Sequence, residues 1–250
     1  PGVMLASSFE KYIHRYGVVP EERPVIFTNN SSTISLVKSL VSLKCKPIAY
    51  IDSRKEENIQ KEIKEYLKIN NIKFYPESEV EGCDGNKKVE NISIRSLKSL
   101  SVVNSSMLCV SGGYNPDIHL FTQSKGLLKW DDEIISFKPD TPFQNTITLG
   151  SVSGNFNFKE LVSEIDKKIS FITNKKYNPA FELNVSENFS ISELWETKTE
   201  KKSNWSKSFI DLHNDVTTKD LKQSILEGYD RIEHLKRYTT NSMGTDQGKI

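Results

Sequence analysis

The sequence predicts an α/β protein: part of a doubly wound, Rossmann-like domain followed by a small helical module. Apolar runs at Pro24–Thr28, Pro47–Asp52 and Ile72–Tyr75 predict strands, the first of them buried, and amphipathic stretches separate them. Such alternation of strand and helix is typical of a parallel sheet with crossover helices. After a polar stretch, residues 206–250 show a second, shorter set of helical patterns.

Three amphipathic stretches predict the helices of the first domain. Val3–Tyr16 has apolar side chains at helical spacing and precedes Gly17, a residue that favours helix ends. A second helix is expected over about 31–41, because Asn30–Ser32 can cap it. A third, charged helix is expected over about 55–69.

The middle of the chain predicts a different sheet. Short alternating runs between 79 and 110 favour antiparallel strands with a turn at Gly82–Gly85, and Ser106–Val110 predicts a buried strand. Leu128–Trp130 and Ile134–Phe137 predict an exposed hairpin.

A turn with two glycines, Gly150–Gly154, lies between a predicted buried strand at Thr146–Leu149 and a predicted helix over about 157–172. A strand-to-helix turn points backbone N–H groups and the positive helix end outward, where a phosphate or ribose can bind. Small residues there also serve tight packing, so both interpretations stay open.

The predicted domains are 1–173, a linker or wrapping arm over 174–205, and a module over 206–250. The arm is polar and shows little periodicity. Trp195 and Trp205 are candidates to fix it in place.

The module is expected to hold two helices. Asp215–Thr218 can cap the first, which Gly228 ends, and the second is expected over Asp230–Tyr238. The Lys-, Arg-, Thr- and Gly-rich end, 236–249, suits phosphate binding through charge and hydrogen bonds. A solvated helix end explains the same residues equally well.

Composition excludes several classes. With 36% hydrophobic and 27% charged residues and a net charge of +1, the chain lacks the basic footprint of a nucleic-acid binder. No apolar run approaches the ~20 residues that cross a bilayer, and a cytoplasmic protein is expected. Cys45, Cys83 and Cys109 are far apart, which favours free thiols. The four histidines show no metal-ligand spacing.

Two loops lack residues that a binding or catalytic role would require: glycine for phosphate binding in the first, and a carboxylate for catalysis in the second. Phe27–Ser32 lies where a βαβ unit carries its phosphate loop, yet it contains no glycine, so we interpret this unit as structural. Ser111–His119 contains a Ser and a His, but no carboxylate is placed to orient the His.

Six stretches along the chain resemble the alpha-subunit family of heterotetrameric sarcosine oxidases. They are Pro1–Ala6, Tyr12–Val18, Val25–Asn30, Ser111–Ser124, Asn214–Thr217 and Ile232–Lys249. The last, IEHLKRYTTNSMGTDQGK, is long and unusual, which makes the resemblance specific. It is weak over 55–100 and 174–205.

The resemblance implies a disulfide-reductase-like dinucleotide domain, then a ferredoxin-like module, then a folate domain similar to aminomethyltransferases. This chain would cover the second part of the first domain and the module. It begins at Pro1 without an initiator Met and stops at Ile250, so we expect an interior piece of such a subunit.

The resemblance also implies a non-redox NAD, at the site where reductase relatives hold FAD. One side of that site falls on Gly150–Phe158, where Ser151, Phe156 and Phe158 would face the nucleotide. Family members often carry Ala, Leu and Thr at these three positions. Phe158 stands in place of the Thr, so the threonine hydroxyl is lost here.

Related amine and proline dehydrogenases hold a [2Fe-2S] cluster in a homologous module through four cysteines. The first Cys-x-Cys pair falls here on Asp211 and His213, and a third cysteine falls on Asp246. No cysteine follows Cys109, and cluster ligation needs thiolates. The resemblance therefore implies a module without an iron–sulfur cluster.

Family members hold an FMN at the alpha–beta interface, attached to the beta subunit. We expect Arg237, Thr239, Thr240 and Lys249 to lie near it. The implied partners are the beta, gamma and delta subunits, with FAD on beta and tetrahydrofolate on the C-terminal domain.

The implied activity is that of an oxidoreductase acting on a CH–NH donor with oxygen. Sarcosine becomes glycine, with hydrogen peroxide and 5,10-methylenetetrahydrofolate as the other products. This chain would hold NAD, help bury FMN and dock beta, so no catalytic residue is expected in it, and alone it would be inactive. The alternatives are a subunit of a related secondary-amine or proline dehydrogenase, and a non-catalytic scaffold without a nucleotide.

Overall fold

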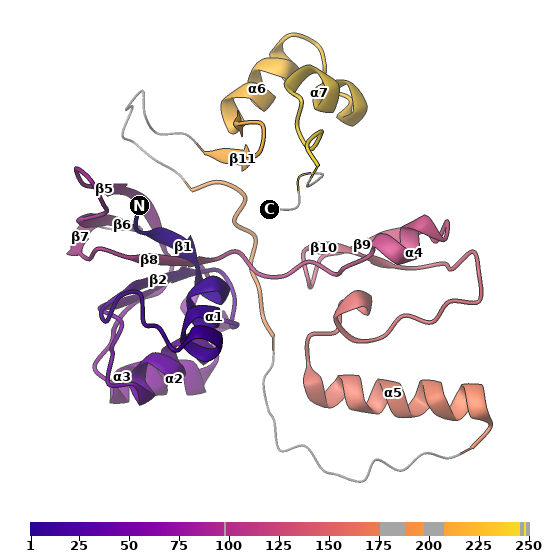
Figure 1. The fold of residues 1–250 in the computed structure, drawn as a ribbon, viewed down its shortest axis with the longest axis horizontal. Coiled ribbons are helices and arrows are strands. Elements are labelled where there is room, and N and C mark those ends of the chain that lie inside the picture. Colours follow the sequence, from indigo (N-terminus) through magenta and orange to yellow (C-terminus); the bar gives the residue numbers. More distant parts are fainter. Residues whose placement is uncertain (98, 176–188, 198–207, 246–247, 249–250) are drawn as a thin grey trace. The chain divides into compact units, whose positions relative to one another are not determined.

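A five-stranded parallel sheet in the order β1-β8-β2-β3-β4 organises the first part of the chain. Its strands are β1 (Val3–Leu5), β2 (Val25–Thr28), β3 (Ala49–Asp52), β4 (Lys73–Tyr75) and β8 (Leu108–Ser111) (Figure 1). The computed structural model describes residues 1–97, 99–175, 189–197, 208–245 and 248, which fall into two units, Pro1–Thr197 and Lys198–Ile250. The predicted Rossmann-like α/β class is confirmed for the first unit.

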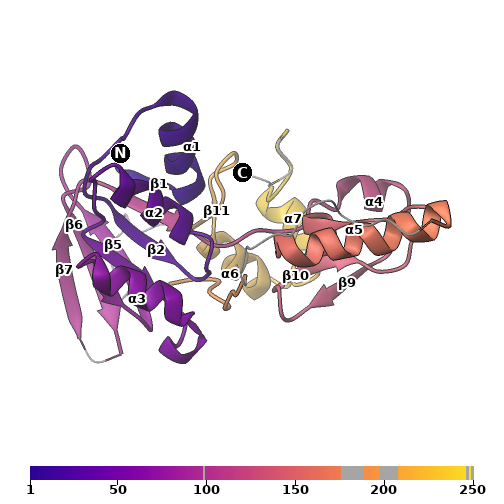
Figure 2. The same cartoon turned by 90° about the horizontal axis from the view of Figure 1, so that it is seen from below.

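Three helices cover one face of this sheet (Figures 1 and 2). They are α1 (Ala6–Tyr16), α2 (Ile34–Ser42) and α3 (Lys61–Ile69), the last preceded by a 3-10 turn, η1 (Glu56–Asn58). Alternate residues of β2 face opposite sides, as in any strand. Ile26 packs with the helices, whereas Val25 and Phe27 pack on the other face.

The other face carries a three-stranded antiparallel sheet of β5 (Ser78–Asp84), β6 (Asn91–Ser96) and β7 (Leu100–Asn104), as predicted. The turn predicted at Gly82–Gly85 is wrong in position. Gly82 and Cys83 pair with Ser93 and Ile92 inside β5, and the register shifts just before Gly82. This glycine therefore marks a β-bulge. Glycine is favoured in β-bulges as it is in turns, so the residue itself does not distinguish the two.

Val3–Leu5, predicted as the start of the first helix, form an edge strand instead. Val3, Met4 and Leu5 pair with β8, and the helix begins at Ala6. The alternation of Val3 and Leu5 fits a strand as well as a helix over so few residues. Backbone pairing with β8 decides between the two.

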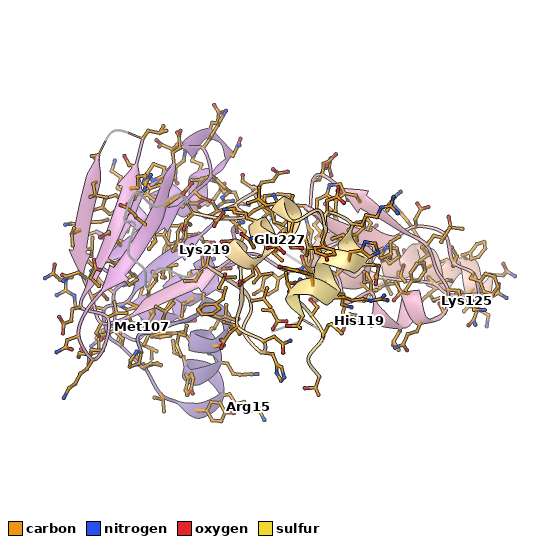
Figure 3. All side chains as sticks on the ribbon, turned by 90° about the horizontal axis from the view of Figure 1, so that it is seen from above. Arg15, Met107, His119, Lys125, Lys219 and Glu227 are labelled. Carbon is orange, nitrogen blue, oxygen red and sulfur yellow. The ribbon has the colours of Figure 1, made fainter. Side chains whose placement is uncertain are left out.

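The rest of the first unit contains α4 (His119–Gln123), the hairpin of β9 (Leu128–Asp131) and β10 (Ser136–Pro139), η2 (Gly150–Ser153) and α5 (Phe158–Thr173). His119 begins α4 and Lys125 follows it (Figure 3). The hairpin and the last helix were both predicted correctly. The strand predicted at Thr146–Leu149 does not form: among the described residues, none pairs with it, and an extended segment becomes a strand only when a neighbour supplies hydrogen bonds.

The second unit pairs β11 (Phe209–Asp211) with β12 (Val216–Thr217) and continues into α6 (Thr218–Leu226) and α7 (Ile232–Thr239). The two predicted helices are confirmed. Thr217 begins α6 through a capping box with Asp220. Glu227, just after α6, accepts a hydrogen bond from the Tyr238 hydroxyl and so ties the two helices together (Figure 3).

Candidate functional site

The parallel sheet has a topological switch point between β2 and β8. From β2 the chain winds through α2 to β3 and on to β4, whereas β8 lies on the other side of β2. In open α/β sheets, ligands bind at such a point, beyond the carboxyl ends of the strands. Here those ends carry the polar loop Asn29–Ser32 after β2 and Ser111 at the end of β8.

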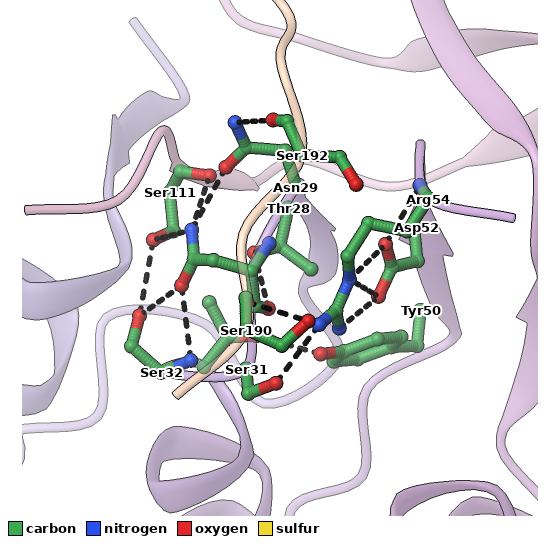
Figure 4. Close-up of polar contacts among 12 residues, drawn as sticks. Thr28, Asn29, Ser31, Ser32, Tyr50, Asp52, Arg54, Ser111, Ser190 and Ser192 are labelled. Carbon is green, nitrogen blue, oxygen red and sulfur yellow. Dashed lines mark hydrogen bonds and ion pairs between the residues drawn. The ribbon is translucent and has the colours of Figure 1, made fainter. Parts of the chain in front are cut away.

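The side chain of Asn30 joins the two strand ends. It is fully buried, and its Nδ2 donates to the carbonyl of Ser111 at 3.3 Å and to the Ser111 hydroxyl at 3.1 Å. Its Oδ1 accepts from the N–H and the hydroxyl of Ser32, at 2.9 and 2.6 Å (Figure 4 draws this network). The Asn30 side chain thus accepts from a loop N–H, that of Ser32, as a bound phosphate does in a glycine-rich loop.

Two further N–H groups of the loop also have partners within the protein. The N–H of Asn30 donates to the Thr28 hydroxyl at 3.1 Å. The N–H of Ser31 donates to the carbonyl of Ser190 at 3.1 Å. The N–H groups of Asn30, Ser31 and Ser32, which a phosphate loop would present to a ligand, are therefore engaged.

An ion pair lies at the end of the neighbouring strand β3. Arg54 donates from Nε to Asp52 Oδ1 at 3.0 Å and from Nη2 to Oδ2 at 2.7 Å, and both side chains are 0% exposed (Figure 4). Burial raises the pKa of the Asp52 carboxyl, and the bonds from Arg54 oppose that shift. In dinucleotide-binding domains an acidic residue or an arginine near this position recognises the ribose. Here both groups are committed to each other.

The turn predicted to hold a nucleotide is a 3-10 turn that ends at Gly154, whose φ is 80°. Asn157 caps the following helix, since its side chain accepts from the N–H groups of Lys159 and Glu160 at 3.0 and 3.4 Å. Ser151 and Phe158 are exposed on the turn and at the helix start. The Asn157 side chain therefore occupies N–H groups in the first turn of α5 that could otherwise bind a ligand. The exposed side chains of Ser151 and Phe158 are the groups here that can face a ligand.

Phe156 lies in an aromatic cluster that was not predicted. Its ring centroid is 4.8 Å from that of Phe189 and 6.3 Å from that of Tyr114. The three rings line a cavity of about 220 Å³, together with Ser31, Ser32, Ile34, Ser35 and Gln60. Its volume is below the ~300 Å³ at which pockets for small molecules begin, so it has room for a single ring-sized group and not for a whole dinucleotide.

Three of the four residues predicted near FMN lie at the end of α7. Arg237 is exposed and approaches Glu233 at 3.8 Å. The Thr239 hydroxyl donates to the carbonyl of Leu235 at 2.7 Å, and Thr240 ends the helix with a φ of 60°. Arg237, Thr239 and Thr240 are thus close neighbours, whereas Lys249 lies outside the described residues.

Asp211, expected from the family resemblance at a cysteine position of cluster-binding relatives, accepts hydrogen bonds from the backbone. Its carboxylate accepts from the N–H groups of His213 at 2.8 Å, Asn214 at 3.1 Å and Ser242 at 2.7 Å. These bonds, that of Ser242 most, lower the pKa of Asp211. The Asp211 carboxylate therefore joins the loop after β11 to the loop after α7. Asp246, the other predicted aspartate, lies outside the described residues.

Neither a metal site nor a membrane-spanning helix is found among the residues that the structure describes. No group of three or more His, Cys, Asp and Glu side chains there is placed to hold a metal ion. None of the helices within the same residues has the length and apolar character to cross a membrane. The three cysteines are free thiols, as predicted.

Comparisons with known proteins cover the whole chain. Residues 205–250 match the family described as sarcosine oxidase A3 domain. The chain is 28% identical over 256 residues to the sarcosine oxidase subunit alpha of Rhizobium meliloti (strain 1021), and 27% identical over 264 residues to that of Corynebacterium sp. (strain P-1). Both alignments include all of this chain, which spans 25% and 27% of those relatives. The predicted family resemblance is thus confirmed.

A solved structure shows a shared fold. The L-proline dehydrogenase from P. horikoshii superposes with a TM-score of 0.56, covering 100% of this chain and 46% of that one, at 19% identity.

The sequence interpretation missed Tyr114, Phe189 and the pair of Asp52 and Arg54. The pair had a usable signal, because an acid at the end of the second strand of a βαβ unit is a ribose-binding position. The aromatic cluster had none, since its members come from three distant segments.

Proposed function

Since the chain is similar along its whole length to the alpha subunits of sarcosine oxidase, we propose that it is a section of such a subunit. The observation that carries the proposal is the pairing of that similarity with the A3-domain match at 205–250. The subunit would belong to a cytoplasmic complex with beta, gamma and delta chains. The complex would oxidise sarcosine to glycine with oxygen, giving hydrogen peroxide and 5,10-methylenetetrahydrofolate.

In this proposal the first unit holds part of a non-redox NAD. Ser151, Phe156 and Phe158 would face the nucleotide from the turn before α5. Two observations support this: Phe156 lines a cavity of ring size, and the donors at the switch point of the sheet are engaged within the protein. Bound NAD would contribute structure and no electron transfer.

The end of α7 would lie near the FMN of the alpha–beta interface. A helix C-terminus carries partial negative charge, which repels a phosphate, so a cation must compensate for it. Arg237 is exposed at this end, and Lys249 follows in sequence. Thr239 and Thr240 add hydroxyl groups near Arg237.

The chain's own part in the reaction is to bind and to position. FAD on the beta subunit would accept the hydride, FMN would pass electrons to oxygen, and tetrahydrofolate would take the one-carbon unit in another domain. No acid, base or nucleophile is assigned to this chain.

The NAD proposal is tested on the intact protein from which this section comes. Denaturing it should release an equimolar amount of NAD, measured by chromatography. Phe156→Ala should lower that amount. Phe171→Ala, at an exposed position of α5, should not. An intact complex that releases no NAD would instead support a nucleotide-free scaffold.

The FMN proposal is tested by flavin content. Arg237→Ala and Lys249→Ala should lower FMN occupancy in the reconstituted complex, because each lost charged hydrogen bond costs roughly 1.5–3 kcal/mol. Lys219→Ala, an exposed lysine of α6, is the matched control. Equal FMN content in all variants would remove these residues from the site. Iron in the intact complex, with its visible absorbance, would favour the dehydrogenase alternative.

A further inference from the structure

A short segment from late in the first unit crosses the switch point of the sheet. We call Phe189–Leu194 the strap. Ile191 forms an antiparallel bridge with Asn30. On either side of that bridge, the N–H of Ser31 donates to the carbonyl of Ser190 at 3.1 Å, and the N–H of Ser192 donates to the carbonyl of Asn29 at 3.0 Å. The strap is therefore held through its backbone, as an added strand is.

Two side chains of the sheet recognise the strap's carbonyl groups. Arg54 Nη1 donates to the carbonyl of Ser190 at 3.1 Å (Figure 4). Asn29 Nδ2 donates to the carbonyl of Ser192 at 2.8 Å. Arg54 is almost fully buried, and its other bonds go to Asp52 and to the Ser31 hydroxyl. The carbonyl of Ser190 thus gives the buried guanidinium of Arg54 a second acceptor at Nη1. Without the strap, Nη1 would keep its bond to the Ser31 hydroxyl and lose this one.

The loop after β8 is shaped to admit the strap. Gly113 has a φ of 97°, and a Cβ built on it would lie 2.4 Å from Ile191 Cδ1. At its two ends, Phe189 packs on Phe156, and Leu194 packs against the core between the two sheets. The strap therefore has polar contacts in its middle and apolar contacts at both ends.

We propose that the switch point of this Rossmann half is a peptide-binding site that the chain fills with its own strap, Phe189–Leu194. The groups that contact the strap are the groups that a dinucleotide would need: the loop N–H after β2 and the arginine beyond β3. Neutral carbonyl groups match them in place of phosphate and ribose oxygens. While the strap is seated, the phosphates and ribose of a dinucleotide cannot bond to these groups.

Hydrogen exchange on the full protein tests the proposal at single amides. Ser192→Pro removes the N–H that bonds Asn29, whereas Ser192→Ala keeps the backbone and is the matched control. If the strap seats as one unit, the proline variant should speed exchange at the Ser31 amide by about tenfold or more, since that amide bonds Ser190. The alanine variant should leave it unchanged. A Ser31 amide equally protected in both variants would overturn the proposal.

A second measurement separates this proposal from the NAD proposal above. Millimolar NADH is added to the unaltered protein, and exchange at the Ser192 amide is followed. The strap model predicts no acceleration, whether or not NAD binds beside Phe156. Acceleration would mean that the nucleotide competes for the switch point and would refute the strap as its occupant.

Discussion

Arg54 neutralises Asp52 two residues earlier in the chain, and water reaches neither side chain. The pair closes the end of β3 and, through Ser31 and Ser190, connects three separate segments. A buried ion pair adds little folding stability compared with apolar residues of the same size. Removing one partner, however, leaves a buried charge without its counter-charge.

Arg54→Met should lower the free energy of unfolding by about 3–5 kcal/mol, because Asp52 stays buried and loses its partner. The double variant Asp52→Leu, Arg54→Met should recover much of that loss. Denaturant unfolding followed by circular dichroism measures both. Lys61→Met, which removes an exposed ion pair with Glu65, should change stability by less than about 1 kcal/mol. A double variant as unstable as the single one would show that the pair itself stabilises the fold.

Gly113→Ala should destabilise the first unit by about 1–3 kcal/mol, because its φ is unfavourable for any side chain and the new Cβ meets Ile191. Gly112→Ala is the control next to it, since nothing lies within 4 Å of a Cβ there. Thermal unfolding of the two variants should separate them. Equal melting temperatures would contradict the contact between this loop and Ile191.

The lowered pKa of Asp211 predicts acid sensitivity in the second unit. A carboxyl with a lowered folded pKa adds stability above its ordinary value of 3.8, and that contribution is lost as the pH falls through the folded value. The amide NMR signal of Ser242, which donates to Asp211, should therefore shift only as the pH falls below 3.8, the ordinary value of the carboxyl. In Asp211→Asn the shift should vanish. A titration that persists in the variant would assign it to another carboxyl.

The thiols should differ in reactivity. Burial raises the pKa of Cys109 to about 12, so the thiolate that alkylates is scarce at pH 8, and the side chain is fully buried. Burial raises the pKa of Cys83 as well. Iodoacetamide followed by mass spectrometry should modify half-exposed Cys45 first and Cys109 only after denaturation. Modification of Cys109 in the native protein would show that β8 opens.

Much of the fold was predictable because local patterns determine it. The three apolar runs that became β2, β3 and β4 are bounded by turns and helices. The runs of β2 and β3 are buried because both strands are central in the parallel sheet, whereas β4 lies at its edge and is only partly buried. What failed depends on partners far away. Val3–Leu5 became a strand only because β8 lies beside it, and Thr146–Leu149 stayed unpaired among the described residues.

The site was less predictable than the fold. A loop without glycine correctly drew attention to the end of β2, but sequence cannot show that the carbonyl of Ser190, more than 150 residues later, meets the N–H of Ser31. Aromatic packing of Phe156 on Tyr114 and Phe189 is likewise long-range. The predicted contacts of Ser151, Phe158, Arg237, Thr239, Thr240 and Lys249 with cofactors remain predictions.

The bonds made by Asn30 have a consequence for how related sequences should vary. A phosphate loop is constrained to glycine because its backbone must approach a ligand, but here a side chain accepts from the N–H of Ser32. Selection on this loop should then act on the asparagine and on its acceptor partner Ser111, not on backbone freedom. In an alignment, Asn30 should covary with Ser111, and Arg54 with Asp52. Glycine should return to this loop only in lineages where both pairings have been lost.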